Sequence, residues 1–440
     1  MNSIERKIAV IGAGVSGLSA AWLLSKAHQV TLYESEARLG GHANTVEAAG
    51  VAVDTGFIVY NEPNYPNLTA LFRHLGVETY ASDMSFGVSM DGGGFEYGST
   101  SLGSLLAQKR NLFRPRFWAM LRDLKRFYGA GRTDAGRLDD EIVSLADYLE
   151  RGGFCSTFQE DHLLPQAAAI WSASLRDIRQ YPAAALLRFF DNHGLMRSVA
   201  DRPKWRTVVG GSRAYVARLS AEFQGRVLTG RPVKTILRGP QGVVVVDRFG
   251  RGEAYDEVVI AAHADQALAM LDAPSAEERR TLGAFRYSRN ETVLHRDRRL
   301  MPNRKAAWSS WNHMGARGEP EGCVTYWMNR LQALPTREDL FVTLNPTRDV
   351  DEAKVLRTQM YEHPLFDAPA IAAQRALWSL QGGRNTWFCG AHFGSGFHED
   401  GLQSGLAVAE AIGGVRRPWM VEAPNGRIHV TELGRRELAA

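Results

Sequence analysis

The stretch KIAVIGAGVSGLSAAWLLSKA, from Lys7 to Ala27, decides how the rest of the chain is interpreted. It begins with a short apolar run typical of a buried strand and continues into an apolar segment long enough for a helix. Between them lies a G-x-G-x-x-G motif formed by Gly12, Gly14 and Gly17. The first glycine permits a tight turn, the second lets the backbone approach a pyrophosphate, and the third lets the helix pack on the strand. The helix N-terminus then offers free N–H groups to the phosphate charge.

A second strand-like segment, QVTLY, ends just before Glu34, which lies twenty residues after Gly14. A carboxylate at this distance accepts hydrogen bonds from ribose hydroxyl groups and repels a 2′-phosphate. The order of strand, glycine-rich turn, helix and second strand therefore predicts a Rossmann-type α/β domain that binds an adenine dinucleotide.

The composition sets limits on location and partners. The chain has 440 residues, of which 45% are hydrophobic and 23% charged, as in ordinary soluble globular proteins. The net charge of +4 does not by itself indicate nucleic acid. The three cysteines are far apart and lack metal-ligand spacing, so we expect a reducing compartment and no metal site. We expect no signal peptide and no transmembrane helix, and hence a cytoplasmic protein.

The residues after Glu34 favour one dinucleotide over another. In ESEARLGGHANTV, Arg38 is followed by Gly40, Gly41 and His42. The segment resembles the E-x-x-x-R-x-G-G-R motif of the flavin-containing amine oxidase and phytoene desaturase superfamily. The resemblance implies that the cofactor is FAD and that the glycine pair runs close along it.

The next segment, VDTGFIVYNEPNYPNL, resembles the D-x-G-G stretch of the same superfamily. The resemblance implies that residues 54–61 pass beside the isoalloxazine ring. Tyr60 and Asn61 at the end of this segment are therefore candidates for the catalytic site, where each could orient a substrate or donate a proton.

Two later segments resemble the superfamily as well. In the block that begins VVGGSRAYVARLSAEF, the resemblance places the backbone of Val233 against the adenine ring. WFCGAHFGSGFHEDGLQSG contains Gly390 and resembles the closing F-A-G … S-G-Y-M-E-G-A-V-E-A-G motif. There the start of a helix points at the flavin, so we expect His398 and Glu399 at the cofactor, His398 through its backbone N–H. The positive end of the helix would stabilise charge on the reduced ring.

The resemblance also divides the chain into domains. We predict a discontinuous FAD-binding domain from residues 1–85, 205–285 and 376–420, and an inserted α+β substrate domain from residues 86–204 and 286–375. Residues 421–440 would form a C-terminal tail.

Three departures weaken an amine oxidase interpretation. His42 stands where the superfamily has the second arginine of G-G-R, and it lacks a permanent charge. The positions of the aromatic pair that encloses an amine are Gly394 and Phe397, and the segment YSRNETVLHRD has no lysine. Segments such as GGHANTV and GFHEDGLQSGL instead resemble bacterial NAD/FAD-binding proteins often found beside cyclopropane-fatty-acid synthases, which implies a lipid acyl substrate.

The substrate domain supplies further candidates. Tyr326 in TYWMNRLQ, which we interpret as a strand, and Phe397 are expected to line the substrate pocket. Residues 109–132 combine basic and aromatic side chains at helical spacing, which is typical of a helix at a membrane interface, or of one docked on its own domain with a solvated basic face. Nucleic acid is not expected, because base-reading motifs are absent.

The sequence thus predicts an FAD-dependent oxidoreductase that desaturates a methylated or otherwise modified acyl chain of a membrane phospholipid by hydride transfer to flavin N5. The electron acceptor, oxygen or a quinone, stays open. Two alternatives also stay open: a flavin amine oxidase, and a non-catalytic FAD-bound partner that presents lipid to a fatty-acyl methyltransferase. The lipid interpretation would place the protein peripherally on the inner face of the membrane.

Overall fold

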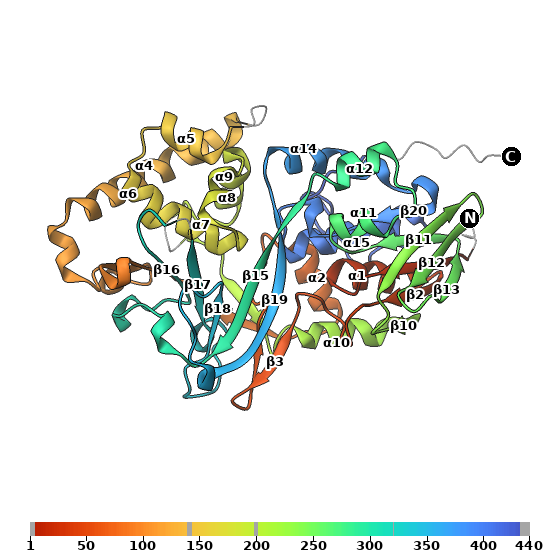
Figure 1. The fold of residues 1–440 in the computed structure, drawn as a ribbon, viewed down its shortest axis with the longest axis horizontal. Helices are drawn as coiled ribbons and strands as arrows, with labels where there is room; N and C mark the ends of the chain where they lie inside the picture. The colour runs from red at the N-terminus through yellow and green to blue at the C-terminus, as the bar shows by residue number, and fades with distance from the viewer. Residues whose placement is uncertain (1–4, 139–142, 198–200, 320, 432–440) are drawn as a thin grey trace.

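The computed structural model describes residues 5–138, 143–197, 201–319 and 321–431. Figure 1 shows two parts, with the long strands β15 (Arg286–His295) and β19 (Val355–Leu365) running between them. One part holds the N-terminal strand and helix, and the other holds a large sheet below a group of helices.

The first part is built on a five-stranded parallel sheet with the order β10-β2-β1-β14-β20. Its strands are β1 (Lys7–Ile11), β2 (Gln29–Tyr33), β10 (Arg226–Leu228), β14 (Glu257–Ile260) and β20 (Thr386–Phe388). They read as near-continuous apolar runs because helices cover both faces of such a sheet. The predicted Rossmann-type domain is confirmed, and its strands come from three distant stretches of sequence.

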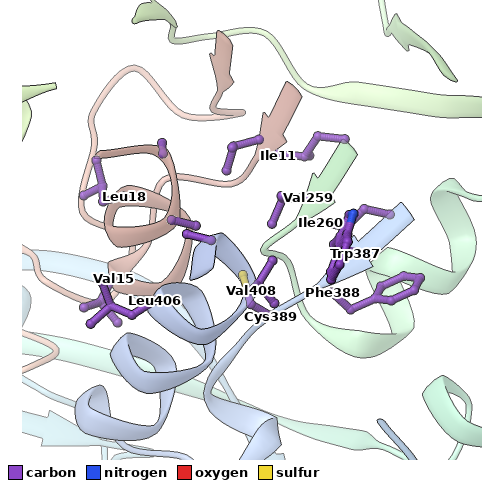
Figure 2. Close-up of a cluster of buried hydrophobic side chains, with 14 of the residues drawn as sticks. Ile11, Val15, Leu18, Val259, Ile260, Trp387, Phe388, Cys389, Leu406 and Val408 are labelled. Carbon is purple, nitrogen blue, oxygen red and sulfur yellow. The ribbon is translucent and has the colours of Figure 1, made fainter. Parts of the chain in front are cut away.

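The helices of this part are α1 (Val15–Leu24), α2 (Pro66–His74), α10 (Arg213–Glu222), α11 (Ala264–Met270), α12 (Ala276–Leu282), α14 (Ala368–Ala376) and α15 (His398–Ile412). An antiparallel sheet is formed by β11 (Val233–Gly239), β12 (Gly242–Asp247) and β13 (Gly252–Tyr255). Figure 2 shows the core between α1, α15 and the parallel sheet, where Val15, Trp387 and Val408 are buried.

Helices α1 and α15 lie unusually close to each other because α15 carries glycine at two positions one helical turn apart. A Cβ atom on Gly401 would lie 2.8 Å from the Ser16 hydroxyl oxygen, and one on Gly405 would lie 2.2 Å from the Ser16 carbonyl oxygen. Side chains at these two positions would push the helices apart. Gly401 and Gly405 of the GFHEDGLQSG segment therefore allow the contact between the helices.

The second part contains a seven-stranded mixed sheet with the order β19-β15-β18-β17-β16-β7-β8. Besides β15 and β19 it contains β7 (Phe86–Met90), β8 (Phe95–Gly98), β16 (Trp311–Gly315), β17 (Gly322–Trp327) and β18 (Phe341–Leu344). Smaller sheets join β3 (Thr45–Ala48) to β4 (Val51–Asp54), and β5 (Tyr60–Asn61) to β9 (Trp205–Val208) and β6 (Thr79–Ser82).

The predicted strand TYWMNRLQ is wrong beyond Trp327, because Met328–Leu331 form a short helix, α13. The Met328 N–H donates to the Leu340 carbonyl at 2.9 Å, and the chain then turns so that Met328 and Leu331 are both fully buried. Burial of residues three apart requires a helical turn rather than a strand.

Helices α4 (Pro115–Arg137), α5 (Leu145–Arg151), α6 (Ser156–Phe158), α7 (Leu164–Trp171), α8 (Leu175–Arg179) and α9 (Ala183–Asn192) cover one end of this sheet, and α3 (Leu102–Leu105) precedes them. Phe117, Met120 and Phe127 of α4 are fully buried, so its apolar face packs on its own domain. Trp118 on the same helix stays 53% exposed. Among the described residues, no helix has both the length and the apolar character to cross a membrane.

Candidate functional site

A cavity of about 860 Å³ lies between the parallel sheet and the mixed sheet. It extends from the glycine-rich turn after β1 to side chains of β16 and β17. Ligands of doubly wound sheets bind at the carboxyl ends of the strands, and this cavity begins there. We call the half around Gly12 to Ser16 the dinucleotide end.

The three glycines of the motif have different surroundings. Gly12 has a φ of +97°, and a Cβ atom there would lie 2.6 Å from the Ala261 carbonyl oxygen. A Cβ atom on Gly17 would lie 1.8 Å from the Gly12 carbonyl oxygen. Gly14 differs, because a Cβ atom there would meet nothing within 4 Å. None of the described residues therefore requires glycine at Gly14, and its absent side chain leaves room for a bound group to approach the backbone.

The start of α1 is open toward an anion. No side chain caps the helix, and its first turn holds no acidic residue. Glu34 lines the cavity at the end of β2, where its carboxylate accepts hydrogen bonds from the Ala13 N–H at 2.8 Å and the Glu36 N–H at 2.9 Å. These bonds fix the carboxylate beside the turn, where a ribose hydroxyl can reach its remaining lone pairs.

The predicted cofactor residues after Glu34 divide into lining and supporting positions. Gly41, with a φ of +55°, lines the cavity, and its added Cβ would lie 3.0 Å from the Gly14 Cα. Gly40 is buried, and a Cβ there would meet the Ala43 carbonyl oxygen at 2.6 Å. Arg38 does not line the cavity and pairs with Glu36 at 3.2 Å, but its Nη1 is buried without a hydrogen-bond partner among the described residues.

Val233 lines the dinucleotide end together with three cations, Arg231, Lys234 and Arg248. Arg231 is held by Asp247, whose carboxylate accepts from its Nε at 2.7 Å. This end of the cavity fits the phosphates and sugar of a dinucleotide. It combines the open start of α1, the unfilled space at Gly14 and the three cations, and the unpaired Nη1 of Arg38 lies buried in the segment that follows Glu34.

His42 lies in a cluster of histidines in the middle of the cavity. Its ring centroid is 5.3 Å from that of His363 and 6.4 Å from that of His263. The His42 Nε2–H donates to the Glu362 carbonyl at 3.1 Å. Burial, together with the charge of His263, lowers the pKa of His42 to about 4, so the ring is neutral near pH 7. His42 therefore does not replace the charge of the arginine found in the superfamily.

The predicted residues before α15 surround the same region. Gly390 and His398 line the cavity. The His398 ring stacks on Phe57 with centroids 3.8 Å apart, and its Nε2 lies 2.7 Å from the Tyr215 hydroxyl oxygen. Burial lowers the pKa of His398 to about 3, which makes the ring neutral. His392, buried beside Gly390, has an Nε2 without a partner among the described residues.

Glu399 does not lie at the cavity, contrary to its predicted place beside the cofactor. Its carboxylate accepts from the Asn67 N–H at 3.0 Å, the Leu68 N–H at 2.9 Å and the Gln403 side chain at 2.9 Å. It thus caps helix α2 and fixes it to α15. Burial raises the pKa of this carboxyl above its usual range.

The segment expected beside the flavin lines the cavity only from Thr55 to Val59. Tyr60 and Asn61, predicted as catalytic, do not line it. Tyr60 is 2% exposed and packs edge-to-face on Phe72, and Asn61 is fully buried. Tyr60 and Asn61 form the short strand β5, which pairs with β9, and both side chains are buried in the core.

The other half of the cavity, which we call the aromatic end, belongs mainly to the second part. It is lined by Met84, Ile170, Trp171, Phe189, His193, Leu195, Trp205, Trp311, Tyr326, Leu344, Phe366 and Phe397. The predicted pocket residues Tyr326 and Phe397 both lie here. None of these twelve side chains carries a formal charge, whereas the Glu362 carboxylate lines the same cavity beside His263, 3.4 Å from its Nδ1. Trp171 and Phe189 lie on helices and His193 directly follows α9; the three residues belong to no motif, so no local pattern indicates them.

Known proteins place this site in a family. A family model described as flavin containing amine oxidoreductase matches residues 15–332, and the chain therefore belongs to that family, with FAD as its cofactor. AofH of Mycobacterium tuberculosis, whose name describes a flavin-containing monoamine oxidase, is 27% identical over 277 residues, which cover 62% of this chain. This region spans only 60% of the length of AofH.

Solved structures share the fold over nearly the whole chain. Cyclohexylamine oxidase from Brevibacterium oxydans IH-35A has a TM-score of 0.67 at 17% identity, with coverage of 93% of this chain and 99% of that chain. A CLA-producing fatty acid isomerase from P. acnes has a TM-score of 0.63 at 16% identity, with the same coverage of 93% and 99%. At these identities the likeness concerns the fold.

Proposed function

We propose that the chain is an FAD-dependent oxidoreductase that desaturates a methylated or otherwise modified, unsaturated acyl chain of a membrane phospholipid. When bound, FAD would supply the redox chemistry as the acceptor, at flavin N5, of a hydride from one C–H bond, while the neighbouring carbon would lose a proton to solvent as the double bond forms. The residues of the chain itself hold and orient the acyl chain and keep water away from it. The observation that carries the proposal is the aromatic end of the cavity, which has no charged side chain.

An uncharged lining favours an uncharged substrate. An ammonium group placed there would lose its hydration without gaining a carboxylate partner, at a cost of several kcal/mol. A free fatty acid would meet no arginine or lysine for its carboxylate. An esterified chain avoids both penalties, and each buried CH₂ group contributes about 0.8 kcal/mol. A solved structure with this fold is named for a fatty acid isomerase, so the fold serves a fatty acid in another protein.

An exposed surface near the start of α4 supports a membrane location for the substrate. Phe113 is 88% exposed and Trp118 is 53% exposed, and the Trp118 indole N–H donates to the Leu112 carbonyl at 2.9 Å. Lys109 and Arg110 beside them are exposed. Aromatic side chains with neighbouring cations fit an interface that contains anionic lipid.

Vesicle sedimentation tests this surface. We expect binding to vesicles that contain anionic phospholipid, and a roughly tenfold loss on replacing Phe113 and Trp118 by serine. Phe249→Ser is the matched control, because Phe249 is 63% exposed on the first part of the molecule. Equal binding to neutral and anionic vesicles, or an equal loss with Phe249→Ser, would contradict the surface.

Amine oxidation is the second candidate, favoured by the likeness to AofH and to cyclohexylamine oxidase. A third is a non-catalytic protein that presents lipid to a fatty-acyl methyltransferase. One experiment separates them: the flavin spectrum of the purified protein is followed without oxygen as phospholipid with methylated unsaturated chains, or an amine panel, is added. Bleaching by lipid supports desaturation and bleaching by an amine supports the oxidase. If neither lipid nor amine changes the spectrum and the protein forms a complex with the methyltransferase, the presenting role is supported.

A further inference from the structure

The aromatic end contains one buried histidine whose hydrogen-bonding capacity is half used. His193 follows α9, lines the cavity and is 2% exposed. Its ring stacks on Phe189 with centroids 3.8 Å apart and lies parallel to Trp205 at 6.0 Å. This packing fixes the plane of the imidazole.

The bond made by one ring nitrogen determines the state of the other. The Nδ1 of His193 lies 2.9 Å from the Phe189 carbonyl oxygen. A carbonyl oxygen can only accept, so Nδ1 carries the hydrogen and Nε2 of the neutral ring carries a lone pair. Nε2 is buried and has no hydrogen-bond partner among the described residues. A buried acceptor left unpaired costs free energy that a bound donor would recover.

The surroundings of His193 select an uncharged donor. The charge that acts on the ring is that of the Arg427 guanidinium, which is paired with Asp400 at 2.6 Å. Burial and Arg427 lower the pKa of His193 to about 3, so the ring stays neutral. A cationic donor would be repelled by Arg427 and would find no carboxylate in the aromatic end.

The aromatic end also contains an unpaired hydrogen-bond donor, which needs an acceptor on a bound molecule. The Trp171 ring packs on Phe189 with centroids 4.7 Å apart, and its indole N–H is buried without a partner among the described residues. An indole N–H can only donate. The aromatic end therefore combines one unused acceptor and one unused donor in aromatic surroundings, and a hydroxyl group has both complementary functions.

We propose that His193 is a specificity-determining residue that accepts a hydrogen bond from an uncharged hydroxyl group on the molecule bound in the aromatic end. The ligand class is an apolar molecule, chain or ring, that carries a hydroxyl group. The inference deepens the proposed function, since it rests on the aromatic end as the substrate site and adds a hydroxyl group to the apolar substrate.

Benzyl alcohol and toluene provide the test, because they have similar size and are small enough to reach any point of the pocket. Their binding to the FAD-loaded protein is measured without oxygen by calorimetry and by ¹⁵N NMR of histidine-labelled protein. We expect wild type to bind benzyl alcohol about tenfold more tightly than toluene. The His193 Nε2 resonance should move only with benzyl alcohol.

His193→Phe keeps an aromatic ring without the acceptor and should lose most of the preference for benzyl alcohol, since only the Trp171 N–H is left to donate to the hydroxyl oxygen. His193→Gln restores an acceptor oxygen and should recover part of the preference; a preference that it recovers also shows that the pocket is intact. Equal binding of the two probes by wild type, or an undiminished preference in His193→Phe, would overturn the proposal. Because no flavin reduction is measured, a failure here is distinguishable from a failure of lipid to bleach the flavin.

Discussion

Replacement of Gly14 by alanine should have opposite effects on the empty and the FAD-loaded protein. The backbone of Gly14 has φ −68° and ψ 179°, a conformation that alanine adopts without strain. A Cβ atom there meets no protein atom within 4 Å. Alanine also restricts the unfolded chain, so the apoprotein should gain about 0.4–1 kcal/mol of stability.

The same methyl group would fill space that the pyrophosphate needs at the start of α1. Overpacking of a close contact costs about 1–3 kcal/mol. The dissociation constant for FAD should therefore rise by about 5- to 150-fold. Titration of apoprotein with FAD, followed by flavin fluorescence, measures the affinity, and thermal unfolding of the apoprotein measures the stability.

Gly17→Ala is the matched control within the same motif. Its Cβ atom would lie 1.8 Å from the Gly12 carbonyl oxygen, so this variant should destabilise the apoprotein itself. Unchanged FAD affinity in Gly14→Ala would refute the assignment of Gly14 to the pyrophosphate. A lower melting temperature of the Gly14→Ala apoprotein would show that the glycine serves packing after all.

Three further changes test the framework of the site. Gly405→Ala should cost about 2–4 kcal/mol in denaturant unfolding, because the added Cβ would lie 2.2 Å from the Ser16 carbonyl oxygen. Glu399→Ala should cost about 2–5 kcal/mol by leaving the N–H groups of Asn67 and Leu68 unpaired, with FAD affinity unchanged. Burial lowers the pKa of His313 to about 4, so its neutral form contributes stability above about pH 6.5, and this contribution is lost as the pH falls toward 4. The free energy of unfolding of wild type should therefore fall by about 3 kcal/mol more between pH 6.5 and pH 4 than that of His313→Leu.

Each change has a control or a contrary result. Gly136→Ala is the control for Gly405→Ala: Gly136 is an exposed residue of α4, and a Cβ atom there would meet nothing within 4 Å, so this change should not destabilise the protein. Weaker FAD binding in Glu399→Ala would return this residue to the cofactor site. An acid dependence that is the same in His313→Leu and wild type would show that His313 is protonated in the folded protein.

The Rossmann-type fold around the dinucleotide end and the FAD cofactor could be predicted from the sequence because the signals for them are local. The turn, its glycines and the carboxylate after β2 lie within one short stretch, and the geometry of that stretch requires glycine at Gly12 and Gly17. The helix predicted within residues 109–132 is present as the first part of α4, because apolar residues that recur every 3.6 residues favour a helix. Contact of the exposed basic and aromatic side chains of residues 109–132 with a membrane stays a prediction.

The aromatic end could not be predicted because its residues meet only through tertiary packing. Tyr60 and Asn61 follow a cavity-lining segment directly, yet they form a short strand that pairs with β9, from the far side of the helical insertion, and both are buried in the core. Glu399 looked like a residue at the start of its own helix and instead caps α2, which is distant in sequence. His193 and Trp171 carry no local signal, because a helix periodicity indicates burial without specifying what is buried beside it.

The topology of the parallel sheet has a consequence for how the protein matures in the cell. Strand β1 pairs with β14, which in turn pairs with β20, and α1 packs on α15. Residues 386–412 therefore complete a domain that begins at residue 7. During synthesis, the first βα unit must wait on the ribosome with its apolar faces uncovered until those late residues emerge. We expect the nascent chain to depend on chaperones over that interval, and cofactor loading to follow release from the ribosome.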